Sequence, residues 1–293
     1  MIQWYLLALI SAFFSAIASI FEKKVLFKEK AIGFSTLFAI FNLLLAIPFF
    51  FFINLELVTS SALLALILKS ILEATAFLCI MQAIKNLELS AALPLLVLTP
   101  GLVAIGAFFI LGEALTQIQI LGIFLLLIGT YTLQVKTKEK QNLLDPIKAF
   151  FKTRTYYYII IALILFTTTS ILDKAILKNF NLPLNAFMGF QHLFLAIIFI
   201  IFIISTKKNQ ELKHSLKFSW KIILTISIFT IIYRYTQLSA VKIAPVALVL
   251  SIKRISVFFA VLIGGRLFHE HDLLIRTIAT GIMITGAVLI ILY

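Results

Sequence analysis

Cysteine and charge are what this sequence has least of. Cys79 is the only cysteine among 293 residues, so no disulfide can form within the chain and no cysteine-based metal site can exist. Only 13% of the residues are charged, whereas 62% are hydrophobic. A soluble domain of this length needs roughly a quarter charged residues to cover its surface. The composition therefore excludes a soluble globular protein and predicts that lipid is the solvent for most of the exterior.

The motifs that bind nucleotides and metals are also missing. No GxxxxGK[ST] segment occurs, which excludes direct use of ATP through a phosphate-binding loop. The histidines show no helical metal spacing such as HExxH, so neither a metal nor a cofactor is expected. An enzyme embedded in the membrane would need a paired acid and base or a metal cluster inside the bundle, and the spans offer too few such groups. The histidines are His192, His214, His269 and His271.

Acidic residues are scarce relative to basic ones, which gives a formal net charge of +13. Such an excess can indicate nucleic-acid binding. Here the lysines and arginines lie mainly in short connections between apolar runs and form no soluble basic domain. The charge is better explained by membrane topology and by attraction to anionic lipid. The expected partner is therefore the lipid bilayer, and no nucleic acid.

Long apolar runs make up most of the chain. A helix that crosses a bilayer needs about 20 mostly apolar residues, and ten runs meet this length. Each span must satisfy its own backbone hydrogen bonds in lipid, which predicts an all-α integral membrane fold rather than a β-barrel. The first run is expected to be a span and not a removable signal peptide, because no positive charge precedes it. The predicted spans cover residues 3–23, 34–53, 63–84, 89–111, 116–134, 156–173, 184–204, 220–241, 245–264 and 273–292.

The two halves of the chain resemble each other. Residues 1–135 and 156–293 each form a five-helix unit, and a basic loop at 136–155 separates them. Because five is odd, the second unit enters the membrane upside down, which predicts ten transmembrane helices in two inverted repeats. Transporters built in this way bind their cargo near the midplane between the halves. The recurring segments are Ser19–Lys23 with Ser170–Lys174, Leu45–Ile47 with Leu195–Ile197, Ala83–Lys85 with Ala240–Lys242, and Leu111–Glu113 with Phe268–Glu270.

Basic residues are shared unevenly between the two sides of the membrane. The connections opposite the termini carry most of them, including the central loop and the polar loop at 205–219. The side of the termini carries only Lys174, Lys178 and Lys242. The positive-inside rule therefore predicts that both termini lie outside the cytoplasm.

The repeated unit, the Gly112-Glu113 pair that ends the fourth span, and the Gly122…Gly129 stretch after it resemble the drug/metabolite transporter superfamily, in its ten-helix EamA-type branch. The resemblance covers essentially the whole chain and implies a carrier of small organic molecules. Members of that superfamily usually keep both termini in the cytoplasm, in conflict with the distribution of lysines. The sequence leaves this conflict open.

A more local likeness lies in the second half. The segments Tyr235–Gln237, Lys242–Pro245 and Lys253-Arg254 resemble the corresponding region of plastid triose-phosphate translocators. In that family the matching tyrosine, lysine and arginine hold the phosphate of the substrate. The likeness thus implies an anion site, with phosphate as one candidate head group.

Lys253 and Arg254 are basic residues placed deep in a predicted span. They lie eight and nine residues into the ninth span, about 12–14 Å deep and close to the midplane. Charges at this depth usually face a cavity and have partners. The functional hypothesis is that they attract an anionic substrate, since arginine suits carboxylate or phosphate and lysine adds a point charge. The alternative is a structural ion pair with Glu73. The first half has no such pair, because the repeat maps these positions onto Leu96 and Val97.

Lys69 and Glu73 share one face of the third span, since they are four residues apart. One interpretation is a self-neutralising pair. The other places Lys69 in the substrate site and makes Glu73, interpreted as the only acid deep in any span, a proton-coupling carboxylate. Arg234 and Tyr235 in the eighth span are further candidates for substrate binding, and for Arg234 the alternative is a snorkelling side chain.

The sequence also predicts where two acid–lysine pairs, one arginine and several glycines lie in the bundle. The acid–lysine pairs Glu22-Lys23 and Asp173-Lys174 are expected to be interfacial, with symmetric gating pairs as the alternative. Arg276 is expected near the membrane surface. Glycines in the fifth and tenth spans indicate close helix packing and offer a candidate homodimer contact. These glycines are Gly122, Gly129, Gly281 and Gly286.

These patterns predict a multi-pass protein of a cell membrane, of the bacterial inner-membrane kind. The hypothesis is a secondary-active transporter that works by alternating access and carries a small anionic or zwitterionic organic metabolite, with a phosphorylated metabolite as one candidate. The second hypothesis is an exporter of amino acids or drugs of the same superfamily. A membrane-embedded lipid-modifying enzyme and a non-transporting sensor are the remaining alternatives from other classes.

Overall fold

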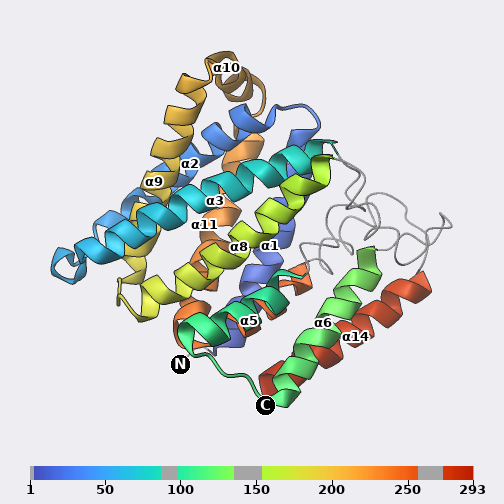
Figure 1. Ribbon diagram of the computed structural model, residues 1–293. Coiled ribbons are helices and arrows are strands. Elements are labelled where there is room, and N and C mark those ends of the chain that lie inside the picture. The colour runs from blue at the N-terminus through green and yellow to red at the C-terminus, as the bar shows by residue number, and fades with distance from the viewer. Residues whose placement is uncertain (1–2, 87–97, 135–153, 257–272, 293) are drawn as a thin grey trace.

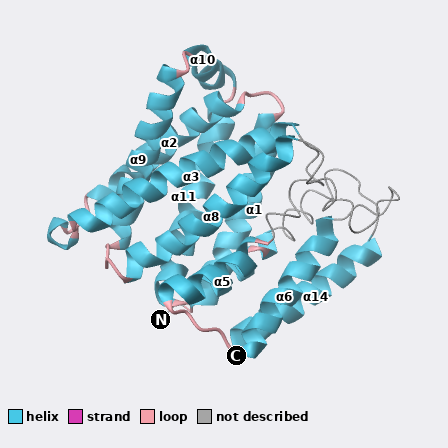
Figure 2. Ribbon diagram, in the orientation of Figure 1, coloured by secondary structure: helices cyan, strands magenta, loops and turns pink. Residues whose placement is uncertain are grey.

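The computed structural model describes residues 3–86, 98–134, 154–256 and 273–292. Every regular element in these ranges is a helix (Figure 2), which confirms the predicted all-α fold. The helices are α1 (Trp4–Leu26), α2 (Ala31–Phe50), the short η1 (Leu55–Leu57), α3 (Ser60–Asn86), α5 (Thr99–Leu111), α6 (Gln117–Gln134), α8 (Arg154–Lys178), α9 (Leu184–Ser205), α10 (Asn209–Phe218), α11 (Trp220–Ile243), α12 (Val246–Lys253) and α14 (Leu273–Leu292).

Each of the ten predicted spans contains a helix. Six helices within the described residues are long and apolar enough to cross a membrane, namely α1, α2, α3, α8, α9 and α11. Helices α5, α6 and α14 are shorter apolar segments. The fourth and ninth predicted spans are seen in part, as α5 and α12, because residues 87–97 and 257–272 lie outside the described residues. The central loop also lies mostly outside them.

The polar stretch 205–219, expected as a loop, contains helix α10. Ser215 is buried there, and the helix lies against α2 so closely that a Cβ on Gly33 would meet the Glu211 carbonyl at 2.6 Å. The predicted loop is wrong, because a polar segment can still form an amphipathic surface helix. Helix α10 is polar on average but still amphipathic, so it can lie across the bundle end. Figure 1 shows it at the end opposite the two termini.

Packing between the halves obeys a two-fold pattern. The first helix of each half packs on the third helix of the other half, as α1 on α11 and α8 on α3. The second helices pack on each other, as α2 on α9, and so do the fifth helices, as α6 on α14. An exchange of the halves leaves this set of contacts unchanged. The predicted pair of inverted five-helix repeats is therefore the architecture of the chain.

Helices α11 and α12 are separated by a break at Ala244-Pro245. Ala244 is extended, with φ −131° and ψ 161°, and Pro245 directly precedes α12. Proline disfavours a helical conformation in the residue before it and has no N–H for a helical hydrogen bond. The break therefore follows from the sequence, and it brings the first turn of a new helix into the bundle.

The fifth helices of the two halves meet through glycine. A Cβ on Gly122 would lie 2.7 Å from the Gly286 carbonyl oxygen, and one on Gly129 would lie 2.8 Å from that of Ala279. Figure 1 shows α6 and α14 running side by side. These glycines are thus used in packing within the chain. Gly281 has no atom of another residue within 4 Å of the place where its Cβ would be, so of the glycines predicted for a dimer contact it alone faces outward.

Candidate functional site

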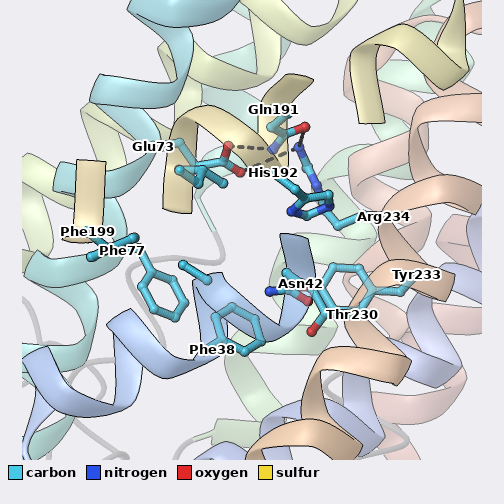
Figure 3. A pocket seen from close by; sticks show the side chains of 12 residues that line it. Phe38, Asn42, Glu73, Phe77, Gln191, His192, Phe199, Thr230, Tyr233 and Arg234 are labelled. Carbon is cyan, nitrogen blue, oxygen red and sulfur yellow. Dashed lines mark hydrogen bonds and ion pairs between the residues drawn. The ribbon is translucent and has the colours of Figure 1, made fainter. Parts of the chain in front are cut away.

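A cavity of about 70 Å³ lies inside the bundle among α2, α3, α9 and α11 (Figure 3). Helices α2 and α3 belong to the first half, and α9 and α11 belong to the second. The cavity therefore sits between the repeats, where an inverted-repeat carrier binds its cargo. Its lining residues are Phe38, Ala39, Asn42, Glu73, Phe77, Gln191, His192, Leu195, Phe199, Thr230, Tyr233 and Arg234.

Four charged side chains form a network at one end of this cavity. Lys69 Nζ lies 2.6 Å from Glu73 Oε2 and 3.0 Å from Asp173 Oδ1. Arg234 Nη2 lies 3.4 Å from Glu73 Oε1 and 3.5 Å from Asp173 Oδ2. Each cation thus bridges both acids, and the four charges cancel. Mutual compensation of this kind is what makes buried charges tolerable in a bundle within lipid.

Gln191 completes the network from α9. Its Nε2 donates to Glu73 Oε2 at 2.6 Å, and its Oε1 accepts from Arg234 Nη2 at 3.2 Å. The amide therefore fixes the distance between the carboxylate and the guanidinium. Figure 3 shows Glu73, Gln191 and Arg234 converging on one side of the cavity. Glu73 and Arg234 line the cavity, whereas Lys69 is fully buried behind them.

Asp173 is the site residue that the sequence placed wrongly. It was expected at the membrane surface at the end of a span, but α8 continues to Lys178 and Asp173 is buried inside the bundle. Glu73 is therefore not the only deep acid. The repeat pairs Asp173 with Glu22, and the structure places Glu22 near enough to Lys253 to interact electrostatically. The two halves thus each provide an acid from their first helix.

Lys174 was also expected at the surface and is buried. Its Nζ donates to the carbonyl oxygens of Val241 at 2.6 Å and Ala244 at 2.7 Å, at the end of α11. It lies 3.5 Å from Glu113 Oε1, and Glu113 Oε2 accepts from the N–H of Val246 at 2.9 Å. The pair thus satisfies backbone groups on both sides of the α11–α12 break. The side chain of its repeat counterpart Lys23 lies outside the described residues.

Lys253, Arg254 and Tyr235 were also predicted as site residues, and they do not line the cavity. Lys253 Nζ donates to Gln237 Oε1 at 2.6 Å and lies 4.6 Å from the centre of the Tyr233 ring. Its hydrogen-bond partner is therefore Gln237, and the alternative of an ion pair with Glu73 was wrong. Arg254 follows α12 directly and makes no hydrogen bond or ion pair with a described residue. Tyr235 stacks on Phe49 with ring centres 5.7 Å apart. The side chain of Arg276 lies outside the described residues.

Aromatic rings form the apolar wall of the cavity. Phe38 stacks on Phe77 with ring centres 5.5 Å apart, and Phe77 meets Phe199 edge-on at 6.2 Å. Figure 3 shows these rings on the side away from Gln191 and Arg234. The cavity is thus amphipathic, with opposite charges at one end and aromatic surface facing them. No group of three or more potential metal ligands occurs among the described residues.

Sequence reasoning missed the neutral polar part of the lining. Asn42, Thr230 and Tyr233 line the cavity together with Glu73 and Arg234. Single polar residues in apolar runs carry little information by themselves. One signal was available, since Thr230, Tyr233 and Arg234 are spaced three and four residues apart and so share a helical face.

Comparison with known proteins gives one family and one fold. The sequence profile of the EamA-like transporter family matches residues 2–134 and 153–292. Twenty-nine solved chains resemble the structure. One of them, described only as the crystal structure of a protein, has a TM-score of 0.73 at 14% sequence identity and covers 98% of this chain and 96% of its own. At that identity it shows the fold alone. No functionally curated protein matches.

Proposed function

Because this chain belongs to the EamA-like transporter family, we propose that it is a secondary-active carrier of a small anionic or zwitterionic metabolite that works by alternating access. The cavity between the repeats is the cargo site. The observation that carries the proposal is the Glu73–Arg234 pair, which brings opposite charges from the two halves to within 3.4 Å of each other at the cavity wall. A charged group of the cargo can take the place of one member of this pair: a carboxylate at Arg234, or an ammonium at Glu73.

Arg234 is the group that binds an acidic head. A guanidinium binds carboxylate or phosphate through two parallel N–H groups. A carboxylate that enters the cavity competes with Glu73 and Asp173 for Arg234, so the buried cation is never left without a counter-charge. Lys253 and Arg254 remain predicted to add positive potential near the site, and phosphate remains a candidate head group.

Glu73 is the group that binds an amine. A substrate ammonium placed at Glu73 while its carboxylate lies at Arg234 preserves the neutrality of the network. The aromatic wall then contacts the apolar part of the molecule. This arrangement favours the second candidate function, a carrier of amino acids, over a carrier of cationic drugs.

The size of the cavity supports alternating access. Small-molecule sites generally have volumes of about 300–1,000 Å³, and this cavity has about 70 Å³. The conformation is therefore a contracted one, and cargo binding requires the halves to move apart. The packing of helices of one half on helices of the other provides surfaces along which such a movement can occur.

The first prediction concerns Arg234. In proteoliposomes, Arg234→Gln is expected to raise the KM for a carboxylate-bearing cargo at least about tenfold, because a charge-assisted pair contributes about 1.5–3 kcal/mol. Arg234→Lys keeps the charge but loses the fork, so an intermediate effect is expected. Lys242→Gln on the exposed end of α11 is the control. Wild-type kinetics in Arg234→Gln would rule out this residue as the anion site.

The second prediction concerns proton coupling through Glu73. When a cargo with a carboxylate and no amine occupies Arg234, Glu73 loses one of its cations and becomes able to accept a proton. For such a cargo, Glu73→Gln is expected to abolish accumulation driven by a pH gradient while exchange of labelled for unlabelled cargo continues. Glu56→Gln, at an exposed acid in η1, is the control. Retained gradient-driven accumulation in Glu73→Gln would show that another group carries the proton.

A further inference from the structure

Three buried side chains in the cavity wall have polar atoms without a hydrogen-bond partner among the described residues. Asn42 on α2, His192 on α9 and Thr230 on α11 are 3%, 2% and 4% exposed. Asn42 Oδ1, both ring nitrogens of His192 and Thr230 Oγ1 form no hydrogen bond with any described residue. The Thr230 hydroxyl lies close enough to the Tyr233 hydroxyl to interact with it, but the two do not reach the distance and angles of a well-formed hydrogen bond. All three residues line the cavity.

Missing partners are not the rule for hydroxyl groups in this chain. The buried Ser70, Thr130 and Ser251 each donate to the carbonyl of the residue four positions earlier, at 2.6–2.8 Å. The buried Ser11 donates to the Tyr233 carbonyl at 2.9 Å. A buried polar group without a partner destabilises a fold. Thr230 therefore departs from the local pattern at the place where a ligand would sit.

The same two helices carry two further buried hydroxyl groups without a partner among the described residues. Ser35 lies seven residues before Asn42 on α2, and Ser227 lies three residues before Thr230 on α11. These spacings keep each pair on one helical face. Both serines are fully buried, and neither hydroxyl has a partner among the described residues. Helices α2 and α11 pack against each other, but neither serine is among the residues that line the cavity.

We propose that Asn42, His192 and Thr230 form a neutral hydrogen-bonding subsite that binds a hydroxyl or amide group of the cargo. This inference rests on the proposed function, because it assigns a second recognition point in the same cavity. Glu73 and Arg234 bind the charged head, and the neutral subsite binds the other end. The cargo is thus a hydroxylated or amide-bearing zwitterion or carboxylate, and not one with a purely hydrocarbon tail.

The chemistry of the three side chains matches this class. An amide, a hydroxyl and an imidazole can each donate and accept, as can a cargo hydroxyl or amide. A second charge at this end would have no counter-charge from Asn42, His192 or Thr230. Selectivity against an analogue without the hydroxyl arises because the buried groups would then stay unpaired.

Binding of matched compounds to the purified full chain tests the subsite. The probes are L-threonine with L-2-aminobutyrate, and glycerate with lactate, which differ by one hydroxyl within each pair. Wild type is expected to bind the hydroxylated member at least about tenfold more tightly. Thr230→Val and Asn42→Leu are expected to reduce that preference to within about twofold and to spare the hydroxyl-free member. Equal wild-type affinity within a pair that binds overturns the subsite and leaves the proposed function intact.

The stability of the unliganded protein provides a test that needs no cargo. Ser227→Ala and Ser11→Ala make the same substitution at fully buried serines, but only Ser11 has a partner. Ser11→Ala is expected to lower the Tm by about 2–4 °C, whereas Ser227→Ala and Thr230→Val leave it unchanged or raise it. A loss of the same size in Thr230→Val would show that the Thr230 hydroxyl is already bonded within the protein, and it would overturn the subsite. Failure of every carboxylate to bind would instead overturn the proposed function, and the stability result would then decide the subsite alone.

Discussion

Lys69 is a buried residue that connects the acids of the two halves. It is fully buried, it contacts a carboxylate from each half, and its Nζ lies 5.4 Å from the centre of the Phe187 ring. The predicted pairing of Lys69 with Glu73 is confirmed, but Asp173 is a second partner. Because Lys69 contacts both acids, Glu73 and Asp173 each keep a positive partner when Arg234 binds a substrate instead. The residue therefore stabilises the site without lining it.

Glu29 is a buried carboxylate outside the membrane spans, between α1 and α2. Burial by itself raises its pKa, but hydrogen bonds from Ser215, Ser219 and His214 outweigh burial and hold the pKa below the ordinary value of 4.5. The bonds from the two serines measure 2.6 and 2.5 Å. The carboxylate thus attaches the surface helix α10 to the bundle.

The sign of the resulting pH dependence follows from the lowered pKa. The stabilisation by Glu29 is complete above its unfolded pKa and is lost as the pH falls through its folded pKa. Glu29→Gln is expected to lower the Tm at pH 7, and the difference from wild type is expected to shrink below about pH 4.5. His214→Gln controls for the neighbouring histidine, and Glu211 with Lys30 is the other charged pair nearby. A difference that stays constant down to pH 3 would contradict the prediction.

At the scale of elements, the α6–α14 pair depends on the absence of side chains. Gly122 and Gly286 face each other. A Cβ on either glycine would lie 2.7 Å from the carbonyl oxygen of the other. Backbones that approach this closely are typical of small-residue packing in membranes, where van der Waals contact replaces the hydrophobic effect.

Gly122→Val is expected to destabilise the protein by about 1–3 kcal/mol through overpacking. Gly281→Ala on the same pair of helices is the matched control, since its Cβ would enter open space, and it is expected to be neutral or slightly stabilising. Thermal unfolding followed by size-exclusion chromatography measures both. Similar losses in the two variants would show that glycine is needed there for a reason other than close approach.

At the scale of the whole molecule, the halves are connected by charge as well as by packing. Glu113 comes from the first half, whereas Lys174 and the α11–α12 break belong to the second. A carrier with inverted repeats moves one half against the other. A buried contact across the halves therefore contributes to the choice of conformation as well as to stability.

Lys174→Met is expected to destabilise the fold by about 3–5 kcal/mol, because it leaves Glu113 buried without its cation. The double variant with Glu113→Gln is expected to recover part of the loss. Lys178→Met, one helical turn further along α8 and exposed, is expected to change stability by less than about 0.5 kcal/mol. Thermal unfolding of wild type, Lys174→Met, Glu113→Gln, the double variant and Lys178→Met tests the coupling, and additive losses from the two single variants would contradict it.

The sequence by itself determined the membrane fold, the ten spans and the repeat. These follow from the length and hydropathy of each run and from the odd number of spans per half, which are properties of local segments. It also determined the Lys69–Glu73 pair, because a spacing of four residues fixes a helical face whatever surrounds it.

Only the tertiary structure decided which charges meet. Asp173 and Lys174 looked interfacial because they lie at the end of an apolar run, and hydropathy does not reveal that α8 continues through the bundle past them. The cavity combines side chains from four helices far apart in sequence, such as Asn42 with Thr230. Their unpartnered atoms are a property of the packed bundle, since partners are set by the neighbouring helices and not by the chain's own periodicity.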